Sequence, residues 1–245
     1  MSRELAALLG LVVVTALAGC SSTPPDRSWR PTFPSDDGLI TNEVGVHKSP
    51  DWQVTSGSLF AASGTGSTGA IDGGAPDASS SRATGSAVFR AVSQRSDFQD
   101  VEVSMEINIG PMTSTPRTPE QDYDGVHVFL RYQSAASLYT VDLCRRDDTV
   151  TIKRKVARSG APDGGDYTTL ISAPYPCKHG IWNRFTATVR NQSSGVSLSL
   201  RDASGSVVSV VDKSSALRSA GRVGLRGDNT PFQFRSFVAA PSEES

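Results

Sequence analysis

The chain has 245 residues, of which 37% are hydrophobic and 20% are charged, and its formal net charge is -1. This composition is ordinary for a globular protein and predicts one sizeable core. The charge balance excludes a generally basic nucleic-acid-binding protein, because a phosphate-binding face needs a surplus of Lys and Arg. Any basic site must therefore be local.

Residues 1–19 have the features of a signal peptide. Arg3 supplies the positive end, and Leu5 to Leu17 form an apolar run that is short for a membrane span. The tetrad that ends this run, Leu17-Ala18-Gly19-Cys20, resembles the lipobox of bacterial lipoproteins, in which acyl chains such as palmitate are attached to the Cys. The resemblance implies an extracytoplasmic protein anchored by lipid at Cys20 to the bacterial cell membrane. The alternative is an ordinary signal peptide followed by an accidental Cys.

Residues 20–38 are expected to form a tether, because they are rich in Pro and Ser and short of aliphatic side chains. The folded domain is then expected over residues 39–240, with a disordered tail at 241–245. Within the domain, residues 61–87 are mostly Ser, Gly, Thr, Ala and Asp, a composition that predicts a long loop.

The rest of the chain is a series of short segments in which apolar and polar residues alternate. The clearest is 101–109, where every second residue is apolar. Further strands are expected within 52–60, 87–92, 123–156, 167–171, 182–189, 196–210 and 221–238. About a dozen short strands separated by turn residues are typical of an all-β antiparallel sandwich of one domain.

The segment from Tyr123 to Val156 predicts three consecutive antiparallel strands. Alternation places the apolar residues of all three on one face, among them Leu130, Val141 and Ile152. The register depends on two predicted turns, a four-residue turn at 133–136 and a two-residue turn at 147–148.

The opposite face of these strands is the candidate site. With those turns, His127, Asp142 and Lys153 line up across the three strands, and Arg131 and Lys155 lie on the same face. His127 beside Asp142 is a candidate general base, since a carboxylate on one ring nitrogen fixes the tautomer of the other. The alternative is a cross-strand charge network that only fixes the register.

Cys144 and Cys177 are the two cysteines that remain if Cys20 carries lipid. Because an exported compartment allows thiols to oxidise, we expect them to form a disulfide. The alternative is two buried free thiols. Neither residue has the spacing of a zinc or redox motif.

Several motifs occur in a characteristic order: Trp52-Gln53-Val54, Gly125-Val126-His127-Val128-Phe129-Leu130-Arg131, Trp182-Asn183 and Gly221-Arg222-Val223-Gly224-Leu225-Arg226. Their order resembles the concanavalin A-like lectin/glucanase sandwich, in particular the laminin-G-like and 3-keto-disaccharide hydrolase-type domains of bacterial exported proteins. The resemblance implies a jelly roll whose polar concave face receives carbohydrate. It does not specify an activity, because this fold hosts lectins, hydrolases and adhesion modules.

The glucanases of this fold carry a Glu-x-Asp-x-x-Glu run on one central strand, and this chain lacks it. The nearest stretch, Glu120-Gln121-Asp122-Tyr123-Asp124, precedes the strand and is expected to be an acidic loop. Asp122 and Asp124 are weak candidates for a structural calcium ion. A helix-loop-helix calcium site is excluded, because its twelfth position would be Arg131 instead of a carboxylate. We expect no other cofactor.

The charge around the candidate face suggests a ligand. From Arg131 to Arg158 there are seven basic and three acidic residues, and such a surplus suits carboxylate, sulfate or phosphate groups on a glycan. The alternative is a solvated strand face.

Three functions follow from this pattern. We favour a membrane-anchored lipoprotein that binds an anion-bearing glycan through His127, Arg131, Asp142, Lys153 and Lys155, because the paired carboxylates of a glycosidase are missing. The second is a glycan hydrolase or lyase that uses His127 and Asp142. The third is a non-catalytic structural protein of the cell envelope.

Overall fold

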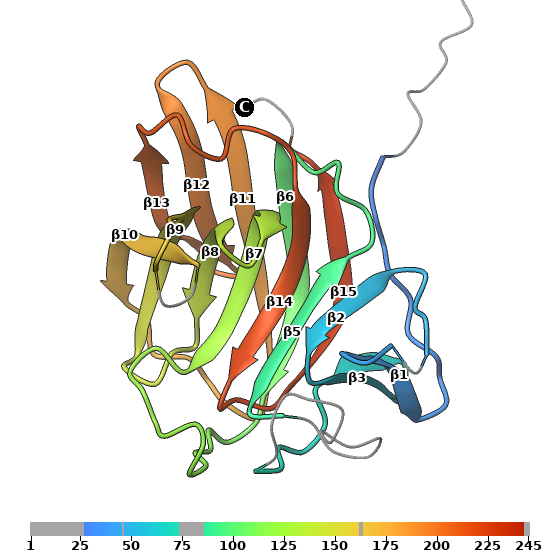
Figure 1. The fold of residues 1–245 in the computed structure, drawn as a ribbon. Coiled ribbons are helices and arrows are strands. Elements are labelled where there is room, and N and C mark those ends of the chain that lie inside the picture. The colour runs from blue at the N-terminus through green and yellow to red at the C-terminus, as the bar shows by residue number, and fades with distance from the viewer. Residues whose placement is uncertain (1–26, 46, 74–85, 162–163, 243–245) are drawn as a thin grey trace, which may run out of the picture.

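The computed structural model describes residues 27–45, 47–73, 86–161 and 164–242 (Figure 1). These residues form fifteen strands and no helix. The strands are β1 (Gly38–Asn42), β2 (Trp52–Ser56), β3 (Ser58–Ala62), β4 (Thr65–Ser67), β5 (Val88–Ser93), β6 (Val101–Ile109), β7 (Gly125–Ser134), β8 (Ser137–Leu143), β9 (Thr149–Ala157), β10 (Gly165–Pro174), β11 (Trp182–Gln192), β12 (Gly195–Asp202), β13 (Gly205–Asp212), β14 (Arg222–Asp228) and β15 (Phe232–Pro241). The predicted signal peptide and Cys20 lie outside the described residues.

Two antiparallel sheets pack face to face (Figure 1). One has eight strands in the order β1-β3-β4-β15-β6-β11-β12-β13, and the other has seven in the order β10-β9-β8-β7-β14-β5-β2. The core lies between them because alternate residues point inward: in β6, residues Val101, Met105 and Ile109 are all at most 1% exposed. The predicted all-β sandwich is confirmed.

The segment before β1 belongs to the folded domain, which corrects the tether predicted to end at residue 38. Trp29 is only 7% exposed, and its backbone pairs with that of Ala239 in β15. Its ring lies 4.9 to 6.0 Å from the rings of Trp52, Phe98 and Phe237. Burial of so large a ring is strongly favourable, so the domain begins by Trp29.

The predicted loop 61–87 and the predicted tail 241–245 are also shorter than expected, because some of their backbone groups form hydrogen bonds with strands of the domain. β4 lies inside the predicted loop 61–87 and pairs with β3 and β15. Pro241 belongs to β15, and the backbone N–H of Ser242 donates to the carbonyl of Asp100. Residues 243–245 of the predicted tail lie outside the described residues.

The three central strands are β7, β8 and β9, and their register is partly as predicted. His127 of β7 pairs with Asp142 of β8, but Asp142 pairs with Thr151 of β9 rather than with Lys153. The cause is the connection between β8 and β9, which spans residues 144–148 instead of a two-residue turn. A shift of two residues keeps every side chain on its face, so Lys153 still lies on the same face as Asp142.

A bulge in β7 moves Arg131 off the predicted face. The pairing with β8 shifts between Leu130 and Ser134, and Arg131 has a left-handed φ of 48°. Its side chain is 0% exposed and turns inward, so the prediction that Arg131 lies on the polar face is wrong. The guanidinium donates to the carbonyls of Gln99 and Leu217, to Oδ1 of Asn191 and to Oδ1 of Asp100, at 2.7 to 2.9 Å.

The predicted disulfide between Cys144 and Cys177 is confirmed, with a Cα–Cα distance of 4.9 Å. Cys144 follows β8, and Cys177 lies between β10 and β11. The bridge closes a loop with a sequence separation of 33, for which the chain-entropy model gives a stabilisation of about 3 to 4 kcal/mol. It joins the end of β8 in the seven-stranded sheet to the chain that enters the other sheet.

We predict that Arg131→Ala destabilises the protein by about 3 to 5 kcal/mol, because it leaves buried carbonyl acceptors without their donor and removes a buried charge from its network. The control is Arg184→Ala, since that side chain is 68% exposed and paired with Glu106; we expect a change within about 0.5 kcal/mol. Urea unfolding of both variants measures the difference. Equal stability of the two variants would contradict the structural role of Arg131.

Candidate ligand-binding site

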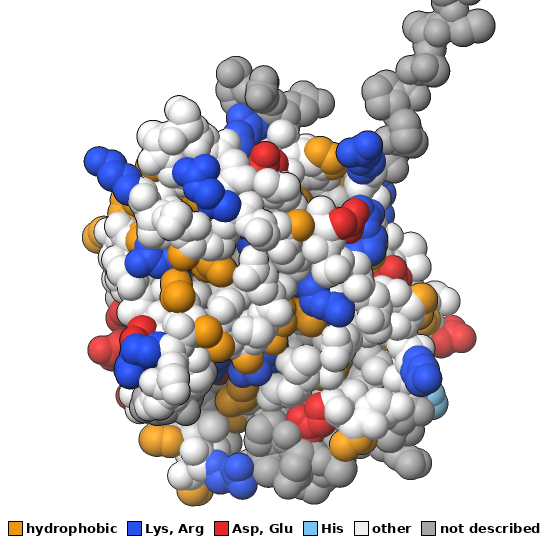
Figure 2. Space-filling model, turned by 45° about the horizontal axis from the view of Figure 1, so that its top comes forward, with side chains coloured by type: hydrophobic (Ala, Val, Ile, Leu, Met, Phe, Trp, Pro, Cys, Tyr) orange, Lys and Arg blue, Asp and Glu red, His pale blue; other side chains and the backbone are white. Residues whose placement is uncertain are grey.

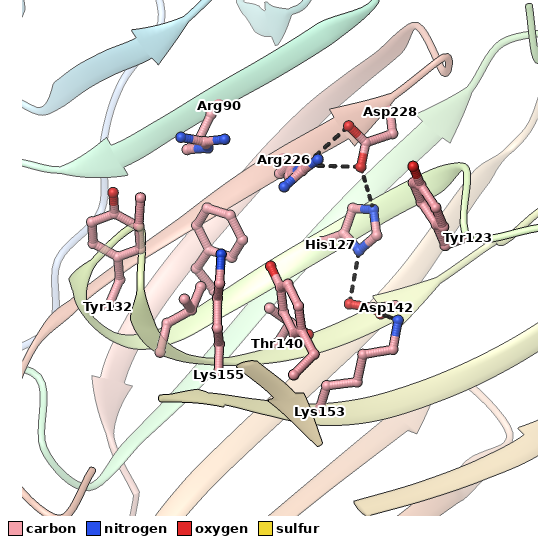
Figure 3. A pocket seen from close by; sticks show the side chains of 14 residues that line it. Arg90, Tyr123, His127, Tyr132, Thr140, Asp142, Lys153, Lys155, Arg226 and Asp228 are labelled. Atoms are coloured by element: carbon pink, nitrogen blue, oxygen red, sulfur yellow. Dashed lines mark hydrogen bonds and ion pairs between the residues drawn. The ribbon is translucent and has the colours of Figure 1, made fainter. Parts of the chain in front are cut away.

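The outward face of the seven-stranded sheet carries a cavity of about 480 Å³. Figure 2 shows basic and apolar side chains next to one another on this side of the molecule, and Figure 3 shows the side chains that line the cavity. Its volume is in the range of small-molecule sites. Strands β5, β7, β8, β9, β10 and β14 contribute to the lining, together with Tyr123 just before β7.

The floor of the cavity is a row of charged side chains on four neighbouring strands. The register places Arg90 of β5 opposite Arg226 of β14, Arg226 opposite His127 of β7, and His127 opposite Asp142 of β8. Side chains that face each other across strands lie about 5 Å apart and interact strongly. Each group in the row therefore affects the ionisation of the next.

His127 is held between two carboxylates (Figure 3). Its Nδ1 lies 2.8 Å from Oδ1 of Asp142, and its Nε2 lies 3.0 Å from Oδ2 of Asp228. Burial by itself lowers the pKa of His127, but the two carboxylates outweigh it and raise the pKa above the usual value. The raised pKa favours the imidazolium form of His127, which forms an ion pair with each of the two carboxylates.

The two carboxylates stay ionised. Burial raises the pKa of Asp142, but His127 and Lys153 outweigh burial and lower it; the Lys153 Nζ lies 2.7 Å from Oδ2. Burial also raises the pKa of Asp228, and Arg226, with its Nε 2.8 Å from Oδ2, and His127 lower it overall. Both carboxylates are thus acceptors only: Asp228 is shared between His127 and Arg226, and Asp142 between His127, Lys153 and Arg145, whose Nη1 lies 3.7 Å from Oδ2.

This arrangement is unsuited to the predicted acid-base role of His127 and Asp142. A general base needs a ring nitrogen that faces the substrate with a free lone pair, whereas both nitrogens of His127 face carboxylates of the protein. A glycosidase acid needs a carboxyl whose pKa is raised, whereas those of Asp142 and Asp228 are lowered. The geometry favours the cross-strand charge network that the sequence left as the alternative.

One end of the cavity is cationic and aromatic. Tyr132 stacks on Phe129 with ring centroids 5.4 Å apart, and the Lys155 Nζ lies 4.8 Å from the ring centroid of Tyr167. Among the described residues Arg90 makes no ion pair, and Figure 3 draws no interaction to its guanidinium. Burial lowers the pKa of Arg90, as does the neighbouring Arg226. The guanidinium of Arg90 at this end therefore carries a positive charge that forms no ion pair with a carboxylate of the described residues.

The charges of the lining do not balance. Four basic residues, Arg90, Lys153, Lys155 and Arg226, meet two acidic ones, Asp142 and Asp228, and the His127 imidazolium adds to the excess. Because the walls are partly aromatic and of low dielectric, this excess acts more strongly on a bound anion than it would in water.

The structure brings together four of the five predicted site residues. His127, Asp142, Lys153 and Lys155 line the cavity, and Arg131 does not. The sequence interpretation missed Arg90, Arg226 and Asp228, which come from strands far away in the sequence. Their only signal was that they are charged residues within the predicted strand segments 87–92 and 221–238.

The acidic loop before β7 is organised by one carboxylate. Asp124 is 1% exposed, and its Oδ2 accepts hydrogen bonds from the backbone N–H of Gln121, the side chain of Asn229 and the guanidinium of Arg146. Within the described residues, no three His, Cys, Asp or Glu side chains group as metal ligands. A calcium ion at Asp122 and Asp124 stays a prediction.

The sequence matches no protein-family model and no curated protein. Solved structures do share its architecture. The Emp46p carbohydrate recognition domain has a TM-score of 0.54 at 10% identity, covering 87% of this chain and 97% of that one. The VIP36 exoplasmic/lumenal domain, crystallised with Ca²⁺ and a mannose-containing glycan, has a TM-score of 0.52 at 9% identity and covers 79% and 85%.

A third similar structure is the carbohydrate-binding module CBM66 from Bacillus subtilis, with a TM-score of 0.50 at 13% identity, covering 77% of this chain and 94% of that one. At such identities the likeness concerns the fold alone. It confirms a concanavalin A-like jelly-roll sandwich, whereas the laminin-G-like and 3-keto-disaccharide hydrolase-type resemblances stay predictions. None of the described residues forms a helix able to cross a bilayer.

We predict that His127 makes stability depend on pH. Because its pKa is raised on folding, its contribution is complete below the unfolded value of about 6.5 and is lost as pH rises through the folded pKa. The lowered pKa values of Asp142 and Asp228 act at the other end: their contribution is present above about 3.9 and is lost as pH falls through the folded values.

His127→Gln tests this prediction, because the amide cannot become a cation. Urea midpoints measured at pH 5 and pH 8 should show that the natural protein gains more stability at pH 5, relative to pH 8, than the variant does. His47 and His179 are present in both proteins, so the comparison isolates His127. An identical pH dependence in both would mean that folding does not raise the pKa of His127.

Proposed function

We propose that the protein binds an anion-bearing glycan in the cavity on its seven-stranded sheet, and that a lipid anchor at Cys20 holds it on the extracytoplasmic side of the bacterial cell membrane. The observation that carries the binding proposal is the cationic excess at one end of an aromatic cavity, where Arg90 makes no ion pair among the described residues. A carboxylate or sulfate supplies the missing partner.

The electrostatic environment of Arg90 is unfavourable in the protein without a ligand. It lies directly opposite Arg226, and like charges at facing positions of a sheet repel each other. It is also half-buried, so water offsets this repulsion only in part. A side chain that is unfavourable for folding is best explained by a favourable contact in the bound state, and a bidentate Arg contact with an anion is such a contact.

The aromatic residues of the cavity suit the apolar faces of sugar rings. Tyr123 and Tyr167 are 46% and 45% exposed, which leaves their rings accessible at the edge of the cavity. A tyrosine ring presents an apolar face for packing and a hydroxyl for hydrogen bonding. The similar folds of a carbohydrate recognition domain and a carbohydrate-binding module support the same ligand class.

Binding without catalysis fits the cavity better than the hydrolase or lyase that the sequence left open. In the network of His127, Asp142 and Asp228, every ring nitrogen and both carboxylates are engaged in ion pairs. These pairs stabilise the floor of the cavity and leave no group in that network free to exchange a proton with a substrate.

We predict that Arg90→Ala lowers the affinity for acidic oligosaccharides about tenfold, the effect of losing a charge-assisted hydrogen bond of about 1.5 kcal/mol. Stability should not fall, because the substitution removes a like-charge contact. Titration calorimetry with acidic and neutral oligosaccharides measures the affinities, which should also weaken as salt rises.

Arg201→Ala is the matched control for this experiment. Arg201 lies on the other sheet, is 53% exposed and pairs with Glu102, so its loss removes the same charge from a place remote from the cavity. If both variants bind acidic oligosaccharides equally well, or if neutral oligosaccharides bind as tightly as acidic ones, the proposed site or ligand class is wrong.

The proposed lipid anchor at Cys20 is tested by a separate experiment. We predict that the mature protein begins at Cys20 and carries acyl chains there, because the apolar run and the small residues before Cys20 end at that position. Mass spectrometry of the mature N-terminal peptide from membranes should show the lipid mass on Cys20. An unmodified peptide that begins elsewhere would refute the anchor.

A further inference from the structure

A second cavity, of about 200 Å³, adjoins the first. The two cavities share Tyr123, Arg226 and Asp228 in their linings. In Figure 3, Tyr123 lies beyond His127, at the opposite end of the first cavity from Arg90 and Tyr132. The second cavity therefore continues the first on the side away from the cationic end.

The wall of the second cavity is held firmly in place. It is formed by residues 117–124 of the connection between β6 and β7, and this connection is tied to the end of β14. The backbone N–H of Thr113 donates to the carbonyl of Asn229, and the Asn229 side chain donates to the carbonyl of Thr118 and to Asp124. A wall fixed before binding costs a ligand little ordering entropy.

The two cavities differ in charge. The second is lined by two basic residues, Arg117 and Arg226, and two acidic ones, Asp124 and Asp228, so it has none of the excess found around Arg90. Asp124 already accepts from Arg146, and Asp228 from Arg226. Besides the exposed guanidinium of Arg117, the second cavity offers neutral hydrogen bonding, from Thr118 and Gln121 and from Asn229, whose buried Oδ1 has no hydrogen-bond partner in the described part of the chain.

We propose that the two cavities form one groove for an oligosaccharide of at least two units, with an acidic unit at the Arg90 end and an uncharged unit in the second cavity. The proposal rests on the proposed function and adds to it a minimum ligand length and an order of charges. Tyr123 lies at the junction, where its exposed ring packs against the link between the two units. A polymer in which acidic and neutral sugars alternate fits this order.

Calorimetry with three probes tests the proposal: glucuronate, a tetrasaccharide of alternating glucuronate and N-acetylglucosamine, and a tetrasaccharide of galacturonate alone. We expect the alternating tetrasaccharide to bind at least tenfold more tightly than glucuronate and more tightly than the uniform acidic tetrasaccharide. Equal affinity for glucuronate and the alternating tetrasaccharide would overturn the two-cavity groove, and tighter binding of the uniform tetrasaccharide would overturn the neutral second cavity. Both results leave the proposed function intact.

The double variant Arg117→Ala/Gln121→Ala tests whether the second cavity binds part of the tetrasaccharide. Both side chains are exposed and line only that cavity, so the protein should stay folded. We expect the variant to bind the alternating tetrasaccharide about five- to tenfold more weakly and glucuronate unchanged, whereas Arg90→Ala weakens both. An unchanged tetrasaccharide affinity in the double variant would overturn the inference. Failure of the unsubstituted protein to bind any of the probes would overturn the proposed function, and the inference with it.

Discussion

The ion pairs of His127 with the carboxylates of Asp142 and Asp228 are the interaction on which the outward face of the seven-stranded sheet depends. β7 supplies the imidazole, and β8 and β14 supply the carboxylates. Each carboxylate has a second cation, Lys153 or Arg226. Buried charges are costly unless they are paired, and removal of one leaves its neighbours incompletely compensated in a place that water does not reach. The alternation of charge therefore fixes how three central strands align beneath the cavity.

The same network decides which charges are left for a ligand. Its two carboxylates are engaged by His127, Lys153, Arg145 and Arg226, whereas Arg90 makes no ion pair among the described residues. Paired charges thus hold the strands together, and the guanidinium of Arg90 lies at the end of the cavity that carries Tyr132. Electrostatic attraction is stronger beside such apolar groups than in water, and this is the physical basis of the proposed preference for anions.

Local alternation was sufficient to predict most of the strands, though not β1 or β4, and a hairpin between neighbouring strands was sufficient to predict the pair His127–Asp142. Arg131 escaped prediction because a bulge adds residues to one strand and reverses the face of those that follow, and nothing in the alternation marks where a bulge occurs. Arg90 and Arg226 escaped for a different reason. Their strands meet β7 only through the order of strands in the sheet, which local patterns do not specify.

The early start of the folded domain limits how far the cavity can lie from a lipid anchor. Trp29 is packed against Trp52 and Phe237, and only residues 21–28 separate it from Cys20. At most about 3.6 Å per residue, this stretch spans about 30 Å, roughly half the reach of a tether that continued to residue 38. If Cys20 carries the lipid, Trp29 therefore lies within about 30 Å of the anchor, and the domain stays close to the bilayer.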